Sequence, residues 1–525
     1  MANRSHGSAY FGLKLLLIVL FTASAKSDIC RSLDRLLFEI GAYSLSDASD
    51  QAVAREDVPV AEYQSQAMQI YAALQLTSPS SYLSPKLTIL QASLSQLALD
   101  KMDIYWLGVS GEFGNSTAYY ALAMQSDNQI QQKTLLAKAA ELNHPQAQFE
   151  LAILQADADA RLDLLVDAGE QGYAPALIAL GKHYFEAGIL PEAQRWLLLA
   201  APLDALSAFK LARINWLNGD ITGASKAFES SLKQGYLPAK GYINVLKRFK
   251  KTNLYDWISA ESIHSLDDDM CLQRIAMLAT SLSSMVQASD FYQRFYSDQR
   301  LKSLPICLQM PTWISEHELE CSAKSNENGR LSCNLLPIAE ITSISDFTHL
   351  VIFAEEGKAN VDNGVMYLDR ADVYSVFVHE LAHFAGFVDE YALGRELANY
   401  HCSQNQAPNL LLLGDIAYKP FARANTWQQI IRDSKIGIES DKRVEIGRSK
   451  TCTNAGLKSY KPSNRMTFLE FHDVGYIPQV YLALWQNALE RHKASRAVNT
   501  NLANAAWKAG RGELAEFWNT QNSDR

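Results

Sequence analysis

Several features that would each point to a class of protein are missing from this chain of 525 residues. Its seven cysteines include no CxxC pair, so a cysteine zinc knuckle is not indicated. A net charge of -9 offers no basic surface for nucleic acid. Beyond the N-terminus no apolar run reaches the roughly 18–20 residues that a membrane span needs. With 48% hydrophobic residues, the chain is expected to be a packed globular protein of several domains.

Residues 1–25 are expected to be a signal peptide, because Arg4 and Lys14 precede a short apolar run and Ala23-Ser24-Ala25 has the small-x-small cleavage pattern. An uncleaved anchor is the alternative interpretation. Residues 26–60 then form an N-terminal segment, for which a removed pro-segment is one interpretation. The mature chain is therefore expected to be exported, to the periplasm or the extracellular space, with no membrane span.

Export favours disulfides over free thiols. We expect Cys321 and Cys333 to close a hairpin, because they flank a polar, turn-rich stretch. The pairs Cys402–Cys452 and Cys271–Cys307 would complete the set and leave Cys30 unpaired. This connectivity is one interpretation among many, since spacing alone does not determine it.

Residues 61–300 are predicted to form an all-α, solenoid-like domain of helical repeats. Alanines at related positions, Ala147, Ala176, Ala208 and Ala239, recur about every 30 residues. A helical hairpin cannot bury its apolar face alone, so neighbouring hairpins stack. The repeated phrase resembles Sel1-like and tetratricopeptide repeats over roughly residues 135–245. Two interpretations stay open, a surface for a protein or peptide partner and a purely structural domain.

Residues 310–495 have a different pattern, with short β-type runs separated by Gly, Asn and Asp turns. Two strands and two helices are expected there, which predicts an α+β domain. Residues 496–525 are expected to be a C-terminal tail, which is polar and frays after about residue 505. The expected strands are 348–353 and 365–368, and the expected helices are 372–386 and 474–493.

The segment that indicates chemistry contains the pattern HExxHxxGxxD. His379 and His383 are four residues apart, so on a helix both imidazoles project from one face and can bind one zinc ion. Glu380 could then take a proton from a zinc-bound water and pass it to a leaving amine. Gly386 fits a left-handed helix end. It lets the reversed chain return Asp389 as the third ligand of one catalytic Zn²⁺.

Other residues compete for the third position. Glu396 is one candidate, although the stretch of chain between His383 and Glu396 is short for a downstream ligand. Glu390 is another, but it would point elsewhere if its neighbour Asp389 binds. His401 and His472 are interpreted as ordinary surface or packed histidines.

The run HELAHFAGFVDEY resembles the IgA-specific metallopeptidase-like family of secreted zinc peptidases, over about residues 330–490. That family usually has Gly where this chain has Ala382. The resemblance implies a metzincin-like catalytic domain with the ligands named above. It also implies a methionine turn below the metal, for which Met466 is the candidate. Phe468 stands where several metzincins place a helper tyrosine, so Tyr391 is proposed as a substitute transition-state helper.

These observations together predict a zinc metallopeptidase, an exported hydrolase of peptide bonds, whose repeats bind substrate or a partner. Two alternatives remain open. One is a non-catalytic repeat scaffold with a structural zinc site. The other is a zinc hydrolase that acts on cell-wall peptides. A family resemblance does not carry the identity of the substrate.

Overall fold

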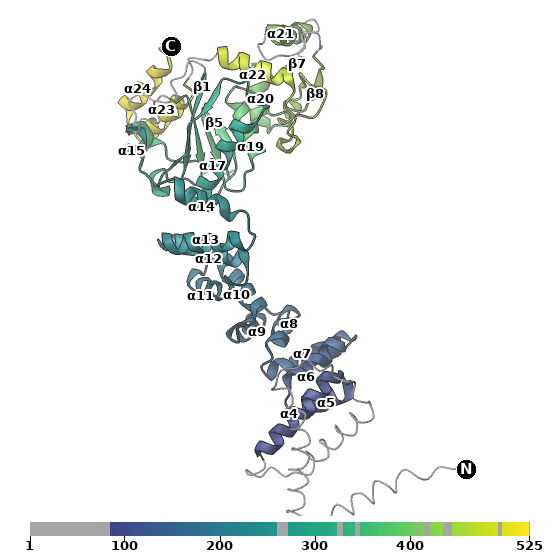
Figure 1. The fold of residues 1–525 in the computed structure, drawn as a ribbon. Coiled ribbons are helices and arrows are strands. Elements are labelled where there is room, and N and C mark those ends of the chain that lie inside the picture. The colour runs from purple at the N-terminus through teal and green to yellow at the C-terminus, as the bar shows by residue number, and fades with distance from the viewer. Residues whose placement is uncertain are drawn as a thin grey trace, which may run out of the picture. The chain divides into compact units, whose positions relative to one another are not determined.

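A computed structural model of the chain describes residues 84–259, 271–322, 329–341, 347–404, 407–413, 420–433, 444–491 and 496–523. The expected signal peptide, the segment 26–60 and Cys30 lie outside these residues. The chain divides into two compact units, Met1–Tyr236 and Leu237–Arg525, which are described separately (Figure 1). We call them the repeat unit and the sheet unit.

The repeat unit is built from short antiparallel helices. Each contacts the next helix along the chain, so the described part is a row of stacked helical hairpins. This agrees with the expected all-α repeat architecture. The helices are α4 (Ser84–Lys101), α5 (Ile104–Glu112), α6 (Ser116–Gln125), α7 (Gln129–Glu141), α8 (Pro145–Ile153), α9 (Ala158–Glu170), α10 (Ala174–Glu186), α11 (Leu190–Ala200), α12 (Ala205–Leu217) and α13 (Ile221–Lys233).

The alanines that revealed the repeat are helix contacts. The side chains of Ala147, Ala176 and Ala208 are all fully buried, because a small side chain lets two helices approach closely. The turns before these helices also match. Asn143 and Gly172 both have positive φ, 57° and 78°. Asn is one of the few non-glycine residues that visits this region readily, which explains why it replaces Gly in one copy of the repeat.

The boundary between the two parts lies earlier than the sequence indicated. The helical domain was expected to run to residue 300, but β1 (Gln273–Ala279) and α17 (Leu282–Ser297) belong to the sheet unit. The reason is that β1 pairs in parallel with β4 (His349–Phe353). A strand fully buried between two neighbours reads as a continuous apolar run, which periodicity does not distinguish from a buried helix.

The main sheet of the sheet unit has the strand order β2-β1-β4-β6-β5, with β3 also pairing β1. Its strands pair in parallel, except that β5 pairs antiparallel to β6. The expected strands at 348–353 and 365–368 are therefore confirmed as β4 and β6. The remaining strands are β2 (Ile306–Leu308), β3 (Thr312–Trp313), β5 (Asn360–Asp362) and β6 (Val365–Leu368).

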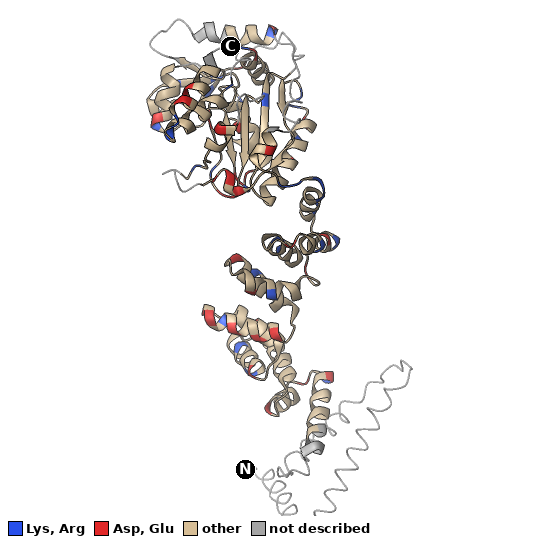
Figure 2. Ribbon diagram, turned by 90° about the vertical axis from the view of Figure 1, so that its left-hand side faces the viewer, with Lys and Arg blue, Asp and Glu red and all other residues tan. Residues whose placement is uncertain are grey.

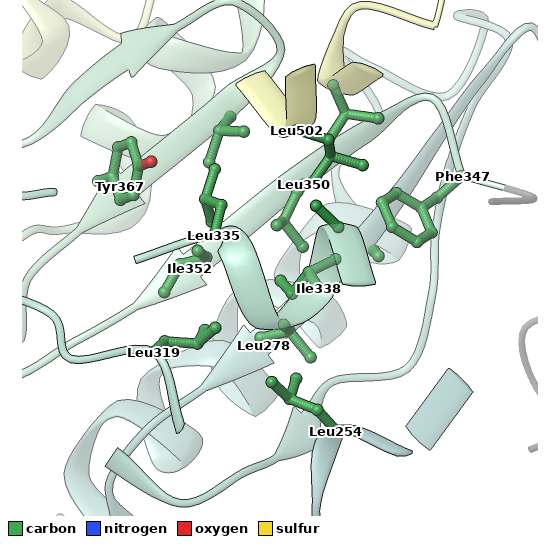
Figure 3. Packing of buried hydrophobic residues seen from close by; sticks show 14 of the residues in the cluster. Leu254, Leu278, Leu319, Leu335, Ile338, Phe347, Leu350, Ile352, Tyr367 and Leu502 are labelled. Carbon is green, nitrogen blue, oxygen red and sulfur yellow. The ribbon is translucent and has the colours of Figure 1, made fainter. Parts of the chain in front are cut away.

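Helices cover both faces of this sheet, as Figure 1 shows with α23 (Val498–Lys508) and α24 (Gly512–Ser523) on one side and α19 (Tyr374–His383) on the other. Leu350 and Ile352 of β4 point into the core on the first side, where Leu502 of α23 meets them (Figure 3). On the second side, Phe291 of α17 packs against Phe353 and Phe377. The second side positions α19, which carries the HExxH residues. Other helices of the first side are α15 (Leu254–Ser259) and α18 (Leu336–Ile341).

The prediction of a C-terminal tail at 496–525 that frays after about residue 505 is wrong for the described residues, which form two helices. Val498 and Leu502 are fully buried, and Trp518 is 1% exposed in the same core. The Trp518 indole donates a hydrogen bond to the Ala339 carbonyl at 3.2 Å. Polar residues dominate the segment, but its few apolar side chains recur at helical spacing and anchor two helices to the sheet.

A second, smaller sheet of order β7-β9-β8 follows the HExxH helix.

All three expected disulfides are present, Cys271–Cys307, Cys321–Cys333 and Cys402–Cys452. They fit a non-reducing compartment. Remaining elements of the sheet unit are α14 (Ala239–Arg248), α20 (Arg395–Gln404), β7 (Leu411–Leu413), α21 (Pro420–Asp433), β8 (Gly447–Ser449), β9 (Lys458–Lys461) and α22 (Gln479–Arg491).

Lys, Arg, Asp and Glu residues are distributed along the helices of both units (Figure 2). Among the described residues, no helix is both long and apolar enough to cross a membrane.

Candidate metal centre

Helix α19 holds the two histidines of the predicted site on one face. Phe377, Val378, Leu381 and Ala382 of this helix are buried, so the helix is fixed against the sheet by its apolar side chains. The imidazole rings of His379 and His383 lie 5.0 Å apart. The spacing of four residues therefore brings both imidazoles to one face of the helix, as the sequence predicted.

Each imidazole is oriented by a backbone carbonyl. His379 Nδ1 lies 2.8 Å from the Phe468 carbonyl oxygen, and His383 Nδ1 lies 2.9 Å from that of Phe387. Because a carbonyl oxygen only accepts, Nδ1 carries the proton and donates in both cases. In the neutral rings each Nε2 then presents a lone pair. This second hydrogen bond is the usual partner of a metal-binding histidine.

Gly386 returns the chain to the histidines. Its φ is +80°, and its N–H donates to the His383 carbonyl at 2.9 Å, so the helix ends in the expected left-handed turn. The returning segment places Asp389 Oδ1 2.8 Å from His379 Nε2 and 3.3 Å from His383 Nε2. The Asp389 backbone carbonyl accepts a hydrogen bond from Thr451 Oγ1 at 2.7 Å, which fixes this position.

These three atoms fit a zinc site. Asp389 Oδ1 is buried and faces both Nε2 atoms, with no other hydrogen-bond partner. Three lone-pair atoms that converge in this way are stabilised by a cation among them, either a proton or a metal ion. Tetrahedral zinc at its usual bond lengths would hold two ligand atoms about 3.3 Å apart, close to the separations here. Two imidazoles and a carboxylate are also a ligand set that zinc accepts.

The ionisation of the cluster follows from the same contacts. Burial would raise the pKa of Asp389, but the hydrogen bonds and charges of the two histidines lower it well below its ordinary value. Burial would lower the pKa of His383, whereas the hydrogen bond and charge of Asp389 raise it to about 9. Without a metal, a proton on His383 thus supplies the positive charge that the cluster requires.

Glu380 lies beside the ligands, with Oε2 4.0 Å from His383 Nε2. His379, Glu380 and His383 each offer an atom within 4.8 Å of the others. Burial raises the pKa of Glu380, although the charges of His383 and His379 oppose this. A carboxyl with a raised pKa exchanges protons more readily near neutral pH.

The centre opens onto a cleft of about 520 Å³ within the sheet unit. Tyr391 borders this cleft with its side chain 44% exposed. Burial and the Asp389 carboxylate, to which it is hydrogen-bonded, raise the pKa of the Tyr391 phenol. The phenol therefore stays protonated at neutral pH. The residues that line the cleft are Gly357, Lys358, Ala359, Asp369, Ala371, Asp372, Val376, His379, Glu380, Tyr391, Glu470, Phe471 and His472.

The structure does not place Met466 as predicted. Its side chain is 49% exposed, whereas a methionine below a metal would be buried. Two residues later, Phe468 is buried and stacks parallel to Trp485 at 6.2 Å. The loop thus approaches the centre through the Phe468 carbonyl, whereas Met466 is exposed.

The competing ligands lie elsewhere. Glu390 is buried with its carboxylate directed to Lys461, 3.0 Å away, and not to the histidines. Glu396 is exposed on α20. His401 lies on the same helix, where burial lowers its pKa. His472 lines the cleft, and its Nδ1 lies 3.0 Å from Ser375 Oγ.

The sequence analysis did not identify three further charged residues in this part of the sheet unit. Asp372 lines the cleft, and burial raises its pKa to about 6. Arg330, on the hairpin closed by Cys321 and Cys333, exerts a charge that lowers the pKa of Glu380. Lys461 is buried at the end of β9. Only the turn-rich stretch between the cysteines gave a signal, and it indicated a hairpin without indicating where the hairpin lies.

Comparison with known proteins adds little to this geometry. No family model matches the chain, and no curated protein matches it. Among solved structures, a Sel1 repeat protein from Oxalobacter formigenes is similar, with 18% identity over 35% of this chain and 88% of that one and a TM-score of 0.25.

Proposed function

We propose that the sheet unit is a zinc-dependent peptidase with a metzincin-like site, and that the repeat unit binds its substrate or a protein partner. The observation that carries this proposal is the convergence of His379 Nε2, His383 Nε2 and Asp389 Oδ1 beside Glu380. Three ligands that leave a side open to a cleft are typical of catalytic zinc, whereas structural sites are closed by four.

His379, His383 and Asp389 would hold the metal, which when bound supplies a Lewis acid that polarises a carbonyl and lowers the pKa of water. Glu380 would act as the general acid/base. Its carboxylate takes a proton from the attacking water and later gives it to the leaving amine. The raised pKa of Glu380 supports this role, because a weaker acid is a stronger base.

Tyr391 would assist at the carbonyl oxygen of the substrate. Its phenol borders the cleft, and its raised pKa keeps the hydroxyl protonated. A neutral donor at this place can hydrogen-bond an oxygen on which negative charge develops. Phe468 cannot do so, because it is buried and has no polar group.

The binding role of the repeat unit is supported by apolar side chains that its helices leave exposed. Leu198 and Leu199 of α11 and the following Leu203 are each more than half exposed. Exposed leucines close together in the chain are typical of a surface that contacts another molecule. A protein or peptide is the partner proposed here, and export to the periplasm or beyond is the proposed location.

The decisive experiment compares zinc content and peptide cleavage of the wild type with those of Glu380→Gln. We expect the variant to keep zinc, since Glu380 is not a ligand, and to lose about 10²–10⁴-fold in cleavage rate. Glu356→Gln is the matched control, because Glu356 is exposed in the same unit. Equal cleavage by wild type and Glu380→Gln would contradict the mechanism. Zinc binding without cleavage of any peptide, cell-wall peptides included, would favour the scaffold.

A further inference from the structure

A buried carboxylate adjoins the third predicted ligand and has no part in the chemistry described so far. Glu390 follows Asp389 and is 1% exposed. Its carboxylate points away from the histidines into the protein. Burying an ionised carboxylate is costly unless it is paired and hydrogen-bonded, so the contacts of Glu390 are informative.

Glu390 has four side-chain donors, two on each oxygen. Lys461 Nζ lies 3.0 Å from Oε2, which Thr467 Oγ1 also contacts. Asn409 Nδ2 donates to Oε1 at 3.1 Å, and the Tyr481 hydroxyl donates to the same atom. An ionised carboxylate only accepts, and this arrangement satisfies both oxygens.

These donors come from segments that also hold the metal-facing atoms. Asn409 exchanges two hydrogen bonds with the backbone of Val388, the residue before Asp389. Thr467 directly precedes Phe468, whose carbonyl orients His379.

The backbone makes the same connection. The Glu390 N–H donates to the Leu469 carbonyl at 3.0 Å, one residue beyond Phe468. One side chain therefore ties the segment that carries Asp389 to the segment that orients His379. Asp389 and the Phe468 carbonyl that orients His379 belong to different segments. Glu390 joins these two segments on the side away from the histidines.

We propose that Glu390, neutralised by Lys461, is a positioning residue that sets Asp389 and His379 at the separation zinc requires. This rests on the proposed function, because it assigns Glu390 a role toward the same metal centre. Groups behind the ligands of a metal typically contribute about 10–100-fold to its affinity. Glu390 would act on zinc only through Asp389 and His379, whose positions it sets.

The competing explanation is an ion pair that stabilises the fold alone. Lys461 also contacts Glu470 Oε2 at 2.8 Å, so it belongs to a network that bears on stability in either case. The two explanations differ in what happens to zinc binding when the protein remains folded.

The test measures zinc affinity by competition with a chelator, the visible spectrum of the Co²⁺-substituted protein, and thermal unfolding in EDTA. For Glu390→Gln we expect zinc affinity to fall by about 10–100-fold and the Co²⁺ spectrum to change, because the ligand geometry loosens. Two control variants distinguish a positioning role of Glu390 from a general effect of lost charge or of lost stability. Glu490→Gln removes an exposed carboxylate on α22, and Leu502→Ala weakens a core away from the centre. Both should keep the affinity and the spectrum.

Unchanged zinc affinity and spectrum in folded Glu390→Gln would overturn the proposal. If that variant does not fold, the pair Glu390→Gln with Lys461→Met removes both charges together, which buried ion pairs often tolerate. The double variant must also bind zinc more weakly than the wild type, and equal affinity overturns the proposal. A wild type that binds no zinc contradicts the metal centre itself, whereas equal binding by wild type and variants contradicts only the role of Glu390.

Discussion

The repeat unit and the sheet unit bury different kinds of side chains. Among the described residues, the buried polar residues of the repeat unit are Ser, Gln, Asn and His, and its core is rich in alanine. The sheet unit buries Glu390, Lys461, His379 and His349. Burial lowers the pKa of His349 to about 3, so this ring is neutral.

The difference lies in Glu390 and Lys461, because among the described residues only the sheet unit buries an acidic and a basic side chain. Buried charge is costly, so it persists where an arrangement of charges is needed and not merely a stable core. In the sheet unit the buried ion pair of Glu390 and Lys461 lies next to Asp389 in the chain. In the repeat unit the same turn and the same alanine recur, which is enough to specify stacked helices.

The largest expected effect is on zinc binding, which should depend on the sheet unit and not on the repeat unit. Asp389→Ala should weaken zinc binding by more than about a hundredfold, because it removes a ligand and not only a supporting group. Asp204→Ala in the repeat unit, which removes the N-cap of α12, should cost about 1 kcal/mol of stability and leave zinc binding unchanged. Chelator competition measures both. Tight zinc binding by Asp389→Ala would move the third ligand to another residue.

Core truncations should then show whether the units unfold separately. Leu180 of α10 and Leu502 of α23 are both fully buried. Replacing either with Ala should cost about 2–5 kcal/mol, through lost burial and the cavity that remains. In calorimetry we expect each variant to lower a different transition. A single transition that both variants lower equally would contradict the division into two compact units.

The left-handed glycines give a smaller, paired effect. Gly172 and Gly386 have φ of 78° and 80°, and a Cβ at either would meet no atom closer than 3.9 Å. Alanine there should therefore cost about 1–2 kcal/mol through backbone strain alone. Gly386→Ala should also weaken zinc binding, since it moves the turn before Asp389, whereas Gly172→Ala should not. Asn143→Gly is the control and should be nearly neutral. Equal zinc affinity in both alanine variants would count against the returning turn.

The smallest effect concerns pH. Burial raises the pKa of Asp372 from 3.8 to about 6, so the folded state binds this proton more tightly than the unfolded state. Ionised Asp372 thus lowers stability above pH 6, and this cost disappears as pH falls toward 4. Asp372→Asn should unfold at a higher temperature than the wild type at pH 7 and at the same temperature at pH 4. The exposed control Asp473→Asn should show no such trend, and a pH-independent difference for Asp372→Asn would refute the assignment.

The sequence predicted what depends on local spacing. The i, i+4 histidines, the turn at Gly386 and the repeated alanines each follow from the geometry of one helix or one turn. It did not predict what depends on partners distant in the chain. The strand β1 pairs with β4, more than 60 residues later, and Lys461 reaches Glu390 from the far side of a loop. Met466 failed for the same reason, because the position of its loop is set by the packing of Phe468 and Trp485.

The Cys402–Cys452 disulfide closes a loop that begins just after the predicted ligands and ends beside them, with a sequence separation of 50 residues. A proteolytic cut in such a loop would normally separate the two parts of the chain. A single cut between these cysteines leaves both ends covalently joined, so the chain that carries Asp389 stays with the chain that carries Phe468. Nicked protein should therefore migrate as one chain on a non-reducing gel and as two after reduction, and any zinc that the uncut protein binds should be retained before reduction.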